Sequence, residues 1–144
     1  MKIQILKKRL EKKKILENEM GENRMRKILA VDDDDDILDV IRIILEDEGY
    51  EVATLTHGQN ILDSITDIKP DLILLDVMLS GMDGRELCKM IKADLNFNLI
   101  PIIMISASHN LNNYAVLPGP PNGFIPKPFD IDKLVDVVNG QFAA

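Results

Sequence analysis

Short apolar runs alternate with segments of helical period along most of the chain. The run ILAV at 28–31 precedes five aspartates, after which apolar residues recur at helical spacing from Ile37 to Leu45 and stop before Gly49. A second run, YEVATL at 50–55, leads to another helical pattern, which Pro70 ends. Each cycle predicts a strand, a loop and a helix.

The same cycle continues toward the end of the chain. The sequence predicts a helix capped by Asp83 and a turn at SGMDG before it. That helix is expected at 84–95. The sequence also predicts strands at 72–75, 100–106 and 123–126 and a last helix at 130–142. Pro126 in the last strand is tolerable only at a sheet edge, because proline has no amide hydrogen for the ladder.

The helix expected between the last two strands is the weakest element. Only residues 107–117 are available for it, because Pro118, Pro120 and Pro121 cannot continue a helix. The sequence therefore predicts a shortened or irregular fourth helix and a mobile, irregular loop from about Asn110 to Asn122.

Strands that read as continuous apolar runs, each followed by a helix, are typical of a parallel sheet covered on both faces. We therefore expect an α/β fold, a doubly wound five-stranded parallel sheet. Ligands of such sheets bind beyond the carboxyl ends of the strands. The polar residues at those ends are the first candidates for function.

Composition narrows the class of protein. A chain of 144 residues with 46% apolar residues is long enough for one domain with a single core. Cys88 is the only cysteine, which excludes a disulfide framework and a cysteine-based metal site. No apolar run reaches membrane-spanning length and the start does not resemble a cleavable leader, so we expect a cytoplasmic protein without membrane contacts.

Charge is divided unevenly along the chain. Residues 1–27 hold ten basic and four acidic side chains, a net charge of +6, whereas the remainder holds seven and twenty, a net charge of −13. The acidic remainder is a poor match for nucleic acid, whose phosphates are contacted chiefly by Lys and Arg. Residues 1–26 are predicted to be a basic N-terminal extension, helical or frayed, because a single short basic helix is marginal alone.

Five polar residues fall at the carboxyl ends of the predicted strands. They are Asp32, Asp33, Asp76, Ser106 and Lys127. Three carboxylates at one edge favour a cation, and oxygen-only ligands suit Mg²⁺ or Mn²⁺ rather than zinc. A hydroxyl and an ammonium group opposite them suit a phosphoryl group. The pattern predicts phosphoryl transfer with Mg²⁺, while Asp34, Asp35 and Asp36 are expected to cap the following helix.

Four segments together carry a family resemblance. ILAVDDDDDI, PDLILLDVMLSGMDG, IPIIMISA and FIPKPF occur in this order and resemble the receiver domain of bacterial two-component response regulators. The similarity covers about Lys27 to Phe142, and residues 27–144 are therefore interpreted as a receiver domain. The family has a flavodoxin-like strand order, 2-1-3-4-5.

The resemblance implies a role for each matching residue. Asp76 would accept the phosphoryl group, and Asp33 would bind Mg²⁺ directly while Asp32 binds it largely through water. The backbone carbonyl of Met78 would complete the metal ligands. The hydroxyl of Ser106 and the ammonium of Lys127 would contact the phosphoryl group. Phe124 would act with Ser106 as the switch, and the bond before Pro128 would be cis.

We therefore expect a phosphoryl-accepting receiver rather than an enzyme. Its donor would be a histidine kinase or a histidine phosphotransfer protein, and its downstream target is a protein that the sequence does not name. The chain ends just after the last predicted helix, so a stand-alone receiver without an output domain is expected. In this family the side chains at the positions of Met78 and Ser108 influence hydrolysis of the acyl phosphate, and neither orients a water well, so slow self-dephosphorylation is predicted.

Two other interpretations remain open at this level. A receiver-like module that binds proteins without being phosphorylated would not need the complete set of five site residues. A phosphohydrolase of the haloacid dehalogenase type would use Asp32 as nucleophile and Asp34 as acid. That second alternative leaves Asp76 unexplained and gives no room for a substrate cap.

Overall fold

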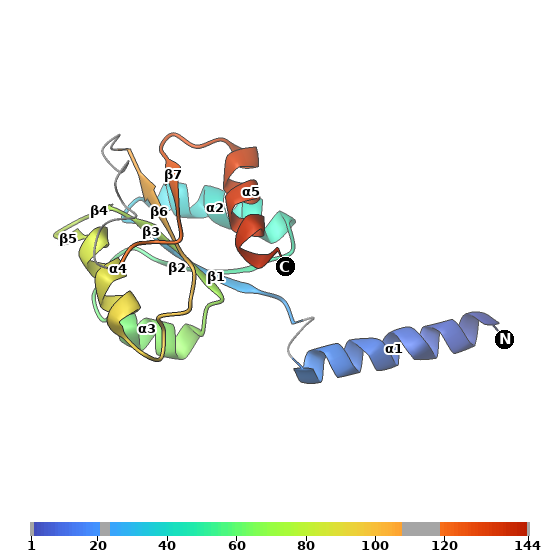
Figure 1. Ribbon diagram of the computed structural model, residues 1–144. Helices are drawn as coiled ribbons and strands as arrows, with labels where there is room; N and C mark the ends of the chain where they lie inside the picture. Colours follow the sequence, from blue (N-terminus) through green and yellow to red (C-terminus); the bar gives the residue numbers. More distant parts are fainter. Residues whose placement is uncertain (1, 21–23, 108–118, 144) are drawn as a thin grey trace.

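The computed structural model describes residues 2–20, 24–107 and 119–143, with side chains throughout except at 13–20. Its main sheet has five parallel strands in the order β2-β1-β3-β6-β7. The strands are β1 (Lys27–Val31), β2 (Glu51–Leu55), β3 (Leu72–Asp76), β6 (Ile102–Ser106) and β7 (Gly123–Pro126). The expected doubly wound, flavodoxin-like order is confirmed (Figure 1).

Helices cover both faces of the sheet (Figure 1). On one face lie α2 (Asp35–Asp47) and α5 (Ile131–Phe142), and on the other lie α3 (Ile61–Ile68) and α4 (Gly84–Ala93). Strand β1 serves both layers, because Leu29 and Val31 pack toward α3 and α4 whereas Ile28 and Ala30 pack toward α2 and α5. This two-sided burial explains why the inner strands are apolar at every position rather than at alternate ones.

The aspartate run is divided between the strand edge and a helix cap. Asp34 is the N-cap of α2, and its carboxylate accepts hydrogen bonds from the amides of Asp36 and Ile37 at 2.9 and 3.4 Å. Asp35 and Asp36 lie in the first turn, where the helix dipole favours acidic groups. Asp83 caps α4 through the amide of Arg85, as predicted. Helices α2 and α4 thus both begin at an aspartate that caps the first amides of the helix.

A small hairpin occupies the segment that was predicted only as a turn. Strands β4 (Met78–Leu79) and β5 (Met82–Asp83) pair in antiparallel fashion, with Ser80 and Gly81 between them. Gly81 has φ +74°, a backbone conformation that favours glycine. The hairpin follows directly on β3 and therefore lies at the edge where the site residues are expected.

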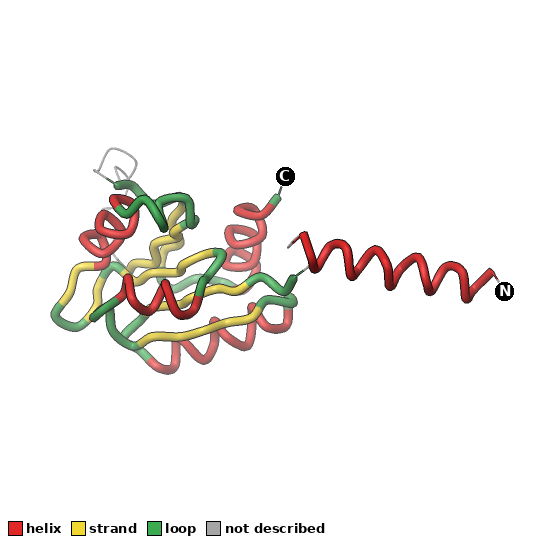
Figure 2. The backbone as a smooth tube through the Cα atoms, turned by 90° about the horizontal axis from the view of Figure 1, so that it is seen from below, coloured by secondary structure: helices red, strands yellow, loops and turns green. Residues whose placement is uncertain are grey.

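The N-terminal segment forms helix α1 (Lys2–Met20), which lies apart from the sheet in both views (Figures 1 and 2). Ile3, Leu6 and Leu10 are each more than half exposed. The segment after the helix is held on the domain: the Arg24 guanidinium pairs with the Asp71 carboxylate, and the Arg26 guanidinium lies 4.4 Å from the centre of the Phe142 ring. Arg24 and Arg26 thus attach the start of the domain to Asp71 and Phe142.

Strand β7 is the edge strand of the sheet and pairs with β6. Pro126 lies opposite Ser106 on this edge strand, as expected from its missing amide hydrogen. The predicted short fourth helix and most of the predicted loop fall at 108–118, outside the described residues. Within the described ranges, no helix is long and apolar enough to cross a membrane.

Candidate functional site

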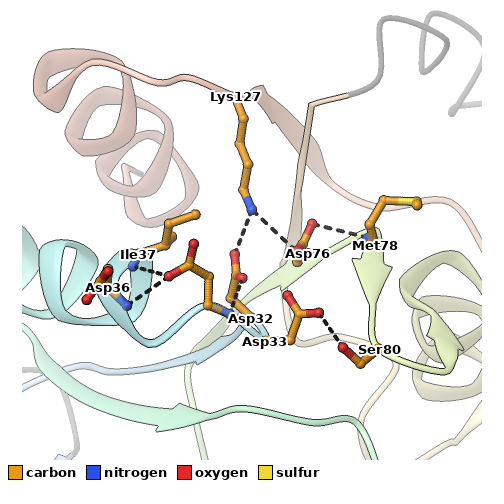
Figure 3. Close-up of polar contacts among 9 residues, drawn as sticks. Asp32, Asp33, Asp36, Ile37, Asp76, Met78, Ser80 and Lys127 are labelled. Atoms are coloured by element: carbon orange, nitrogen blue, oxygen red, sulfur yellow. Dashed lines mark hydrogen bonds and ion pairs between the residues drawn. The ribbon is translucent and has the colours of Figure 1, made fainter.

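Three carboxylates meet where β1 and β3 end. One oxygen from each of Asp32, Asp33 and Asp76 lies within 4.8 Å of the others, the only such acidic cluster among the described residues. Val31 pairs with Leu75 in the parallel register, so the residues that follow the two strands leave the sheet side by side. Figure 3 shows the carboxylates directed toward a common space.

Lys127 joins two of these carboxylates. Its Nζ lies 2.8 Å from Oδ2 of Asp32 and 3.3 Å from Oδ2 of Asp76, and Figure 3 shows the side chain reaching between them. The backbone amide of Lys127 donates to the carbonyl of Ser106 at 2.7 Å, which holds the end of β7 beside β6. The bond between Lys127 and Pro128 is cis, as predicted.

Backbone amides fix the orientation of both buried carboxylates. The amide of Asp34 donates to Oδ1 of Asp32 at 2.9 Å, and the amide of Met78 donates to Oδ1 of Asp76 at 3.2 Å. Each carboxylate therefore has one oxygen toward a backbone amide and the other toward Lys127. Such charge-assisted bonds hold a carboxylate in one rotamer.

Burial singles out the same residues. Among the described residues, the buried polar or charged side chains are Asp32, Asp76 and Ser106, with exposed fractions of 2%, 4% and 0%. Burying a carboxylate is unfavourable unless it is paired, and buried ionisable groups with a specific charge partner are candidates for function. Here the pairing is with Lys127, which joins the two buried acids at the sheet edge.

The electrostatics of Asp76 and Lys127 are coupled. Burial raises the pKa of the Asp76 carboxyl above its usual value, and the nearby Asp32 carboxylate adds to the rise, whereas the Met78 amide and Lys127 oppose it. For Lys127, burial lowers the pKa, but Asp32 and Asp76 together outweigh burial and the pKa is raised. The ammonium therefore stays protonated beside a carboxylate of increased basicity.

The remaining predicted residues lie around this centre. Ser106 ends β6, one residue beyond the position opposite Asp76, and is fully buried. Phe124 is partly buried on β7 and packs against the core on the α3 and α4 side. Met78 begins β4, and its side chain is 69% exposed. Ser108 lies outside the described residues.

One contact at the site was not anticipated from the sequence. The hydroxyl of Ser80 donates to Oδ2 of Asp33 at 2.7 Å across a separation of 47 residues (Figure 3). Asp33 is the exposed member of the acidic cluster. The turn residues in SGMDG indicated a change of direction but carried no signal for the target of the hydroxyl.

The donor set fits a hard divalent cation. All three side chains offer carboxylate oxygens, and the described part of the site has no imidazole or thiolate ligand. Mg²⁺ is bound in proteins through one or two carboxylates with waters and phosphate oxygens. The three aspartates are therefore the residues that would hold such an ion.

An apolar groove adjoins the site. It has a volume of about 460 Å³ and lies between the start of α2 and the segment from β7 to α5. Its lining combines the ammonium-bearing Lys127 with apolar side chains and the acid Asp36, namely Asp36, Ile37, Val40, Ala107, Lys127, Pro128 and Phe129. The groove therefore lies next to Lys127, which contacts the buried carboxylates.

Comparison with known proteins agrees with this geometry. Residues 28–139 match the response regulator receiver domain family. The DNA-binding response regulator MtrA of Mycolicibacterium smegmatis is 33% identical over 117 residues, covering 81% of this chain and 50% of that protein. The chain spans about half the length of the curated relatives it matches.

Solved structures show the same likeness. A putative response regulator from Chloroflexus aurantiacus superposes with a TM-score of 0.75 at 31% identity, covering 84% of this chain and all of that one. The response regulator TrrA of Thermotoga maritima, solved in complex with Mg²⁺-BeF, gives a TM-score of 0.72 at 27% identity, covering 81% and 99% of the two chains. The chain belongs to the response regulator receiver domain family.

Proposed function

We propose that this receiver is phosphorylated on Asp76 in a Mg²⁺-dependent reaction. The observation that carries the proposal is the placement of Asp76, whose two oxygens face the Met78 amide and the Lys127 ammonium. The Asp32 carboxylate shares the same ammonium. A buried carboxylate held between a fixed amide and a fixed cation is oriented for attack on phosphorus.

The proposed reaction is a transfer between two side chains. An oxygen of the Asp76 carboxylate forms a bond to phosphorus while the bond between phosphorus and a histidine nitrogen of the donor breaks. The imidazole leaves with the electron pair of that bond and then takes up a proton. Lys127 and the buried Ser106 follow neighbouring strand ends, and both are proposed to contact the oxygens of the transferred group.

Asp32, Asp33, Asp76 and the Met78 carbonyl are proposed to hold Mg²⁺, with Mn²⁺ as a substitute. A bound Mg²⁺ supplies neutralisation of negative charge on the phosphoryl oxygens. The all-oxygen cluster supports this choice. The Mg²⁺-BeF complex of TrrA supports it by similarity, because that protein shares the fold and the family.

The donor is proposed to be a histidine kinase or a histidine phosphotransfer protein. The groove beside Lys127 supports this partner, since Ile37, Val40 and Phe129 offer an apolar contact next to the acceptor carboxylate. We also propose that the protein is cytoplasmic. Residues 27–144 are proposed to form the receiver unit, and the basic segment precedes it. Phe124 and Ser106 are proposed as the switch that reports the phosphorylated state.

The proposal is tested by phosphorylating the purified chain with a small donor such as acetyl phosphate. Intact-mass measurement should show one added phosphoryl group in the presence of Mg²⁺ and none in EDTA. Asp76→Asn should abolish the addition. Asp67→Asn is the matched control, because Asp67 is exposed near the end of α3 and contributes nothing to the acidic cluster.

The same experiment separates the alternatives. Labelling that persists in Asp76→Asn and is lost in Asp32→Asn would support the phosphohydrolase interpretation. Absence of labelling in the parent chain with every small donor and with histidine kinases would support a binding module that is not phosphorylated.

A further inference from the structure

We infer that Ser80 is a positioning residue for the cation site, acting through Asp33. The inference rests on the proposed function, because it concerns the residues proposed to hold Mg²⁺. It starts from the hydrogen bond of 2.7 Å between the Ser80 hydroxyl and Oδ2 of Asp33. The hydroxyl holds one carboxylate oxygen and leaves the other available to a cation.

Asp33 is the cluster member that most needs such support. The Asp32 carboxylate is held by the Asp34 amide and Lys127, and the Asp76 carboxylate is held by the Met78 amide and Lys127. The Asp33 side chain is exposed, and the hydrogen bond that it accepts comes from the Ser80 hydroxyl. An exposed side chain without this bond would have to be ordered when the cation binds, at a cost in rotamer entropy.

The position of Ser80 is set by the hairpin rather than by the side chain itself. Met78 pairs with Asp83 and Leu79 with Met82, which leaves Ser80 and Gly81 as the two linking residues. The φ of +74° at Gly81 completes this tight reversal. Ser80 is thereby directed back toward the end of β1, as Figure 3 shows.

The hairpin is in turn fixed to β3. The amide of Gly84 donates to the carbonyl of Val77 at 2.8 Å. A Cβ at position 84 would lie 2.0 Å from the carbonyl oxygen of Asp76, so only glycine permits this approach. Leu79 is buried in the core on the α3 and α4 side. Ser80 is therefore held at a fixed place relative to Asp76, and it transmits that placement to Asp33.

A hydroxyl in this position also reduces the repulsion between carboxylates. One oxygen from each of the three aspartates lies within 4.8 Å of the others, and the hydrogen bond that Ser80 donates offsets part of the negative charge on Asp33. Groups that orient metal ligands in this way typically change metal affinity by about 10-fold to 100-fold when removed.

The test is a calorimetric titration of the full chain with MgCl₂ at constant ionic strength and neutral pH. Ser80→Ala should weaken Mg²⁺ binding by about 10-fold, whereas Ser80→Thr, which keeps a hydroxyl, should bind with nearly the parent affinity. Urea unfolding in EDTA is measured for each variant. Ser80→Ala should match the parent there, because its effect is on the cation site and not on the hairpin.

A double-mutant cycle shows whether the effect passes through Asp33. In an Asp33→Asn background, Ser80→Ala should produce no further loss of Mg²⁺ affinity. Equal affinities of the parent and Ser80→Ala, or an undiminished effect of Ser80→Ala in the Asp33→Asn background, would overturn the role of Ser80 while leaving the proposed function intact. A parent chain that does not bind Mg²⁺ would overturn both.

Discussion

The ammonium group of Lys127 lies 2.8 Å from Oδ2 of Asp32, although the two residues are 95 positions apart in the chain. This ion pair is nearly excluded from solvent on the carboxylate side, since the Asp32 side chain is 2% exposed. The same ammonium also faces Asp76. Lys127 therefore holds the two buried carboxylates together at the ends of the strands.

Replacing Lys127 by methionine should lower the free energy of unfolding by about 1–3 kcal/mol at neutral pH, because two buried carboxylates lose their cation. The loss should shrink at low pH, where the Asp76 carboxyl, whose pKa is raised by burial, becomes protonated. Urea unfolding followed by circular dichroism measures both effects. Lys133→Met, at an exposed position in α5, is the control. Equal stability of Lys127→Met and the parent at neutral pH would contradict the assignment.

Asp76→Asn should stabilise the folded chain at neutral pH in the absence of divalent cations. Burial raises the pKa of Asp76 in the folded state, with a further contribution from Asp32. The unfolded chain therefore ionises this group at lower pH, and stability falls as pH rises through the interval between the unfolded and folded pKa values. Below about pH 4, the usual aspartate range, the advantage of Asp76→Asn should disappear.

The predicted pH dependence is checked by measuring the unfolding of the parent chain and of Asp76→Asn across the acidic range in EDTA. Asp39→Asn, which makes the same substitution at an exposed position in α2, serves as the matched control. A stabilisation by Asp76→Asn that persists unchanged to the lowest pH would show that the effect is not caused by ionisation of Asp76.

Removing residues 1–23 should leave phosphorylation and thermal stability as in the parent chain. Helix α1 lies apart from the sheet (Figure 1). Arg24, which pairs with Asp71 on the domain, is kept in this deletion. Removing residues 1–26 should lower stability by up to about 1 kcal/mol, because Asp71 loses its bidentate partner Arg24.

Arg24→Ala in the full-length chain isolates that ion pair. This variant should lose the part of the stability that the Arg24–Asp71 pair provides. The rest of the loss in the longer deletion is expected from Arg26, which covers the Phe142 ring. The proposed independence of the N-terminal segment would be wrong if the shorter deletion abolished phosphorylation.

Met78→Asn should hasten loss of the phosphoryl group from Asp76. The Met78 side chain is 69% exposed beside the acceptor and has no group that orients water, whereas a carboxamide does. We expect an increase in the hydrolysis rate on the order of 10-fold. The rate is followed by intact mass after the donor is removed, with Met78→Leu as the apolar control. Faster loss in the parent than in Met78→Asn would refute this account.

Asn122→Ala should destabilise the chain by about 1 kcal/mol, because it removes an acceptor from two donors at once. Oδ1 of Asn122 accepts from the Ile102 amide at 2.9 Å and from Nζ of Lys92 at 2.7 Å. Asn122→Asp keeps the acceptor oxygen and should retain the stability. Thermal unfolding distinguishes these variants, and equal losses in both would assign the effect to another cause.

Much of the fold was predictable because it depends on near neighbours. Runs of consecutive apolar residues, each followed by a helical pattern, predicted a parallel sheet buried on both faces. The structure contains this sheet. Asp34 and Asp83 were predictable as caps since an N-cap acts on amides two or three residues away. The hairpin at 78–83 was missed because two-residue strands carry too few positions to show a period.

The sequence by itself determined which residues reach the functional edge. Parallel strands end at the same side of a sheet, so the parallel direction alone brings Asp32, Asp76, Ser106 and Lys127 to one side. Only the tertiary structure decided which groups pair there. The contacts of Lys127 with Asp32, of Ser80 with Asp33 and of Arg24 with Asp71 join residues 95, 47 and 47 positions apart. Such pairs depend on register, hairpin geometry and packing, and no local pattern of the chain encodes these.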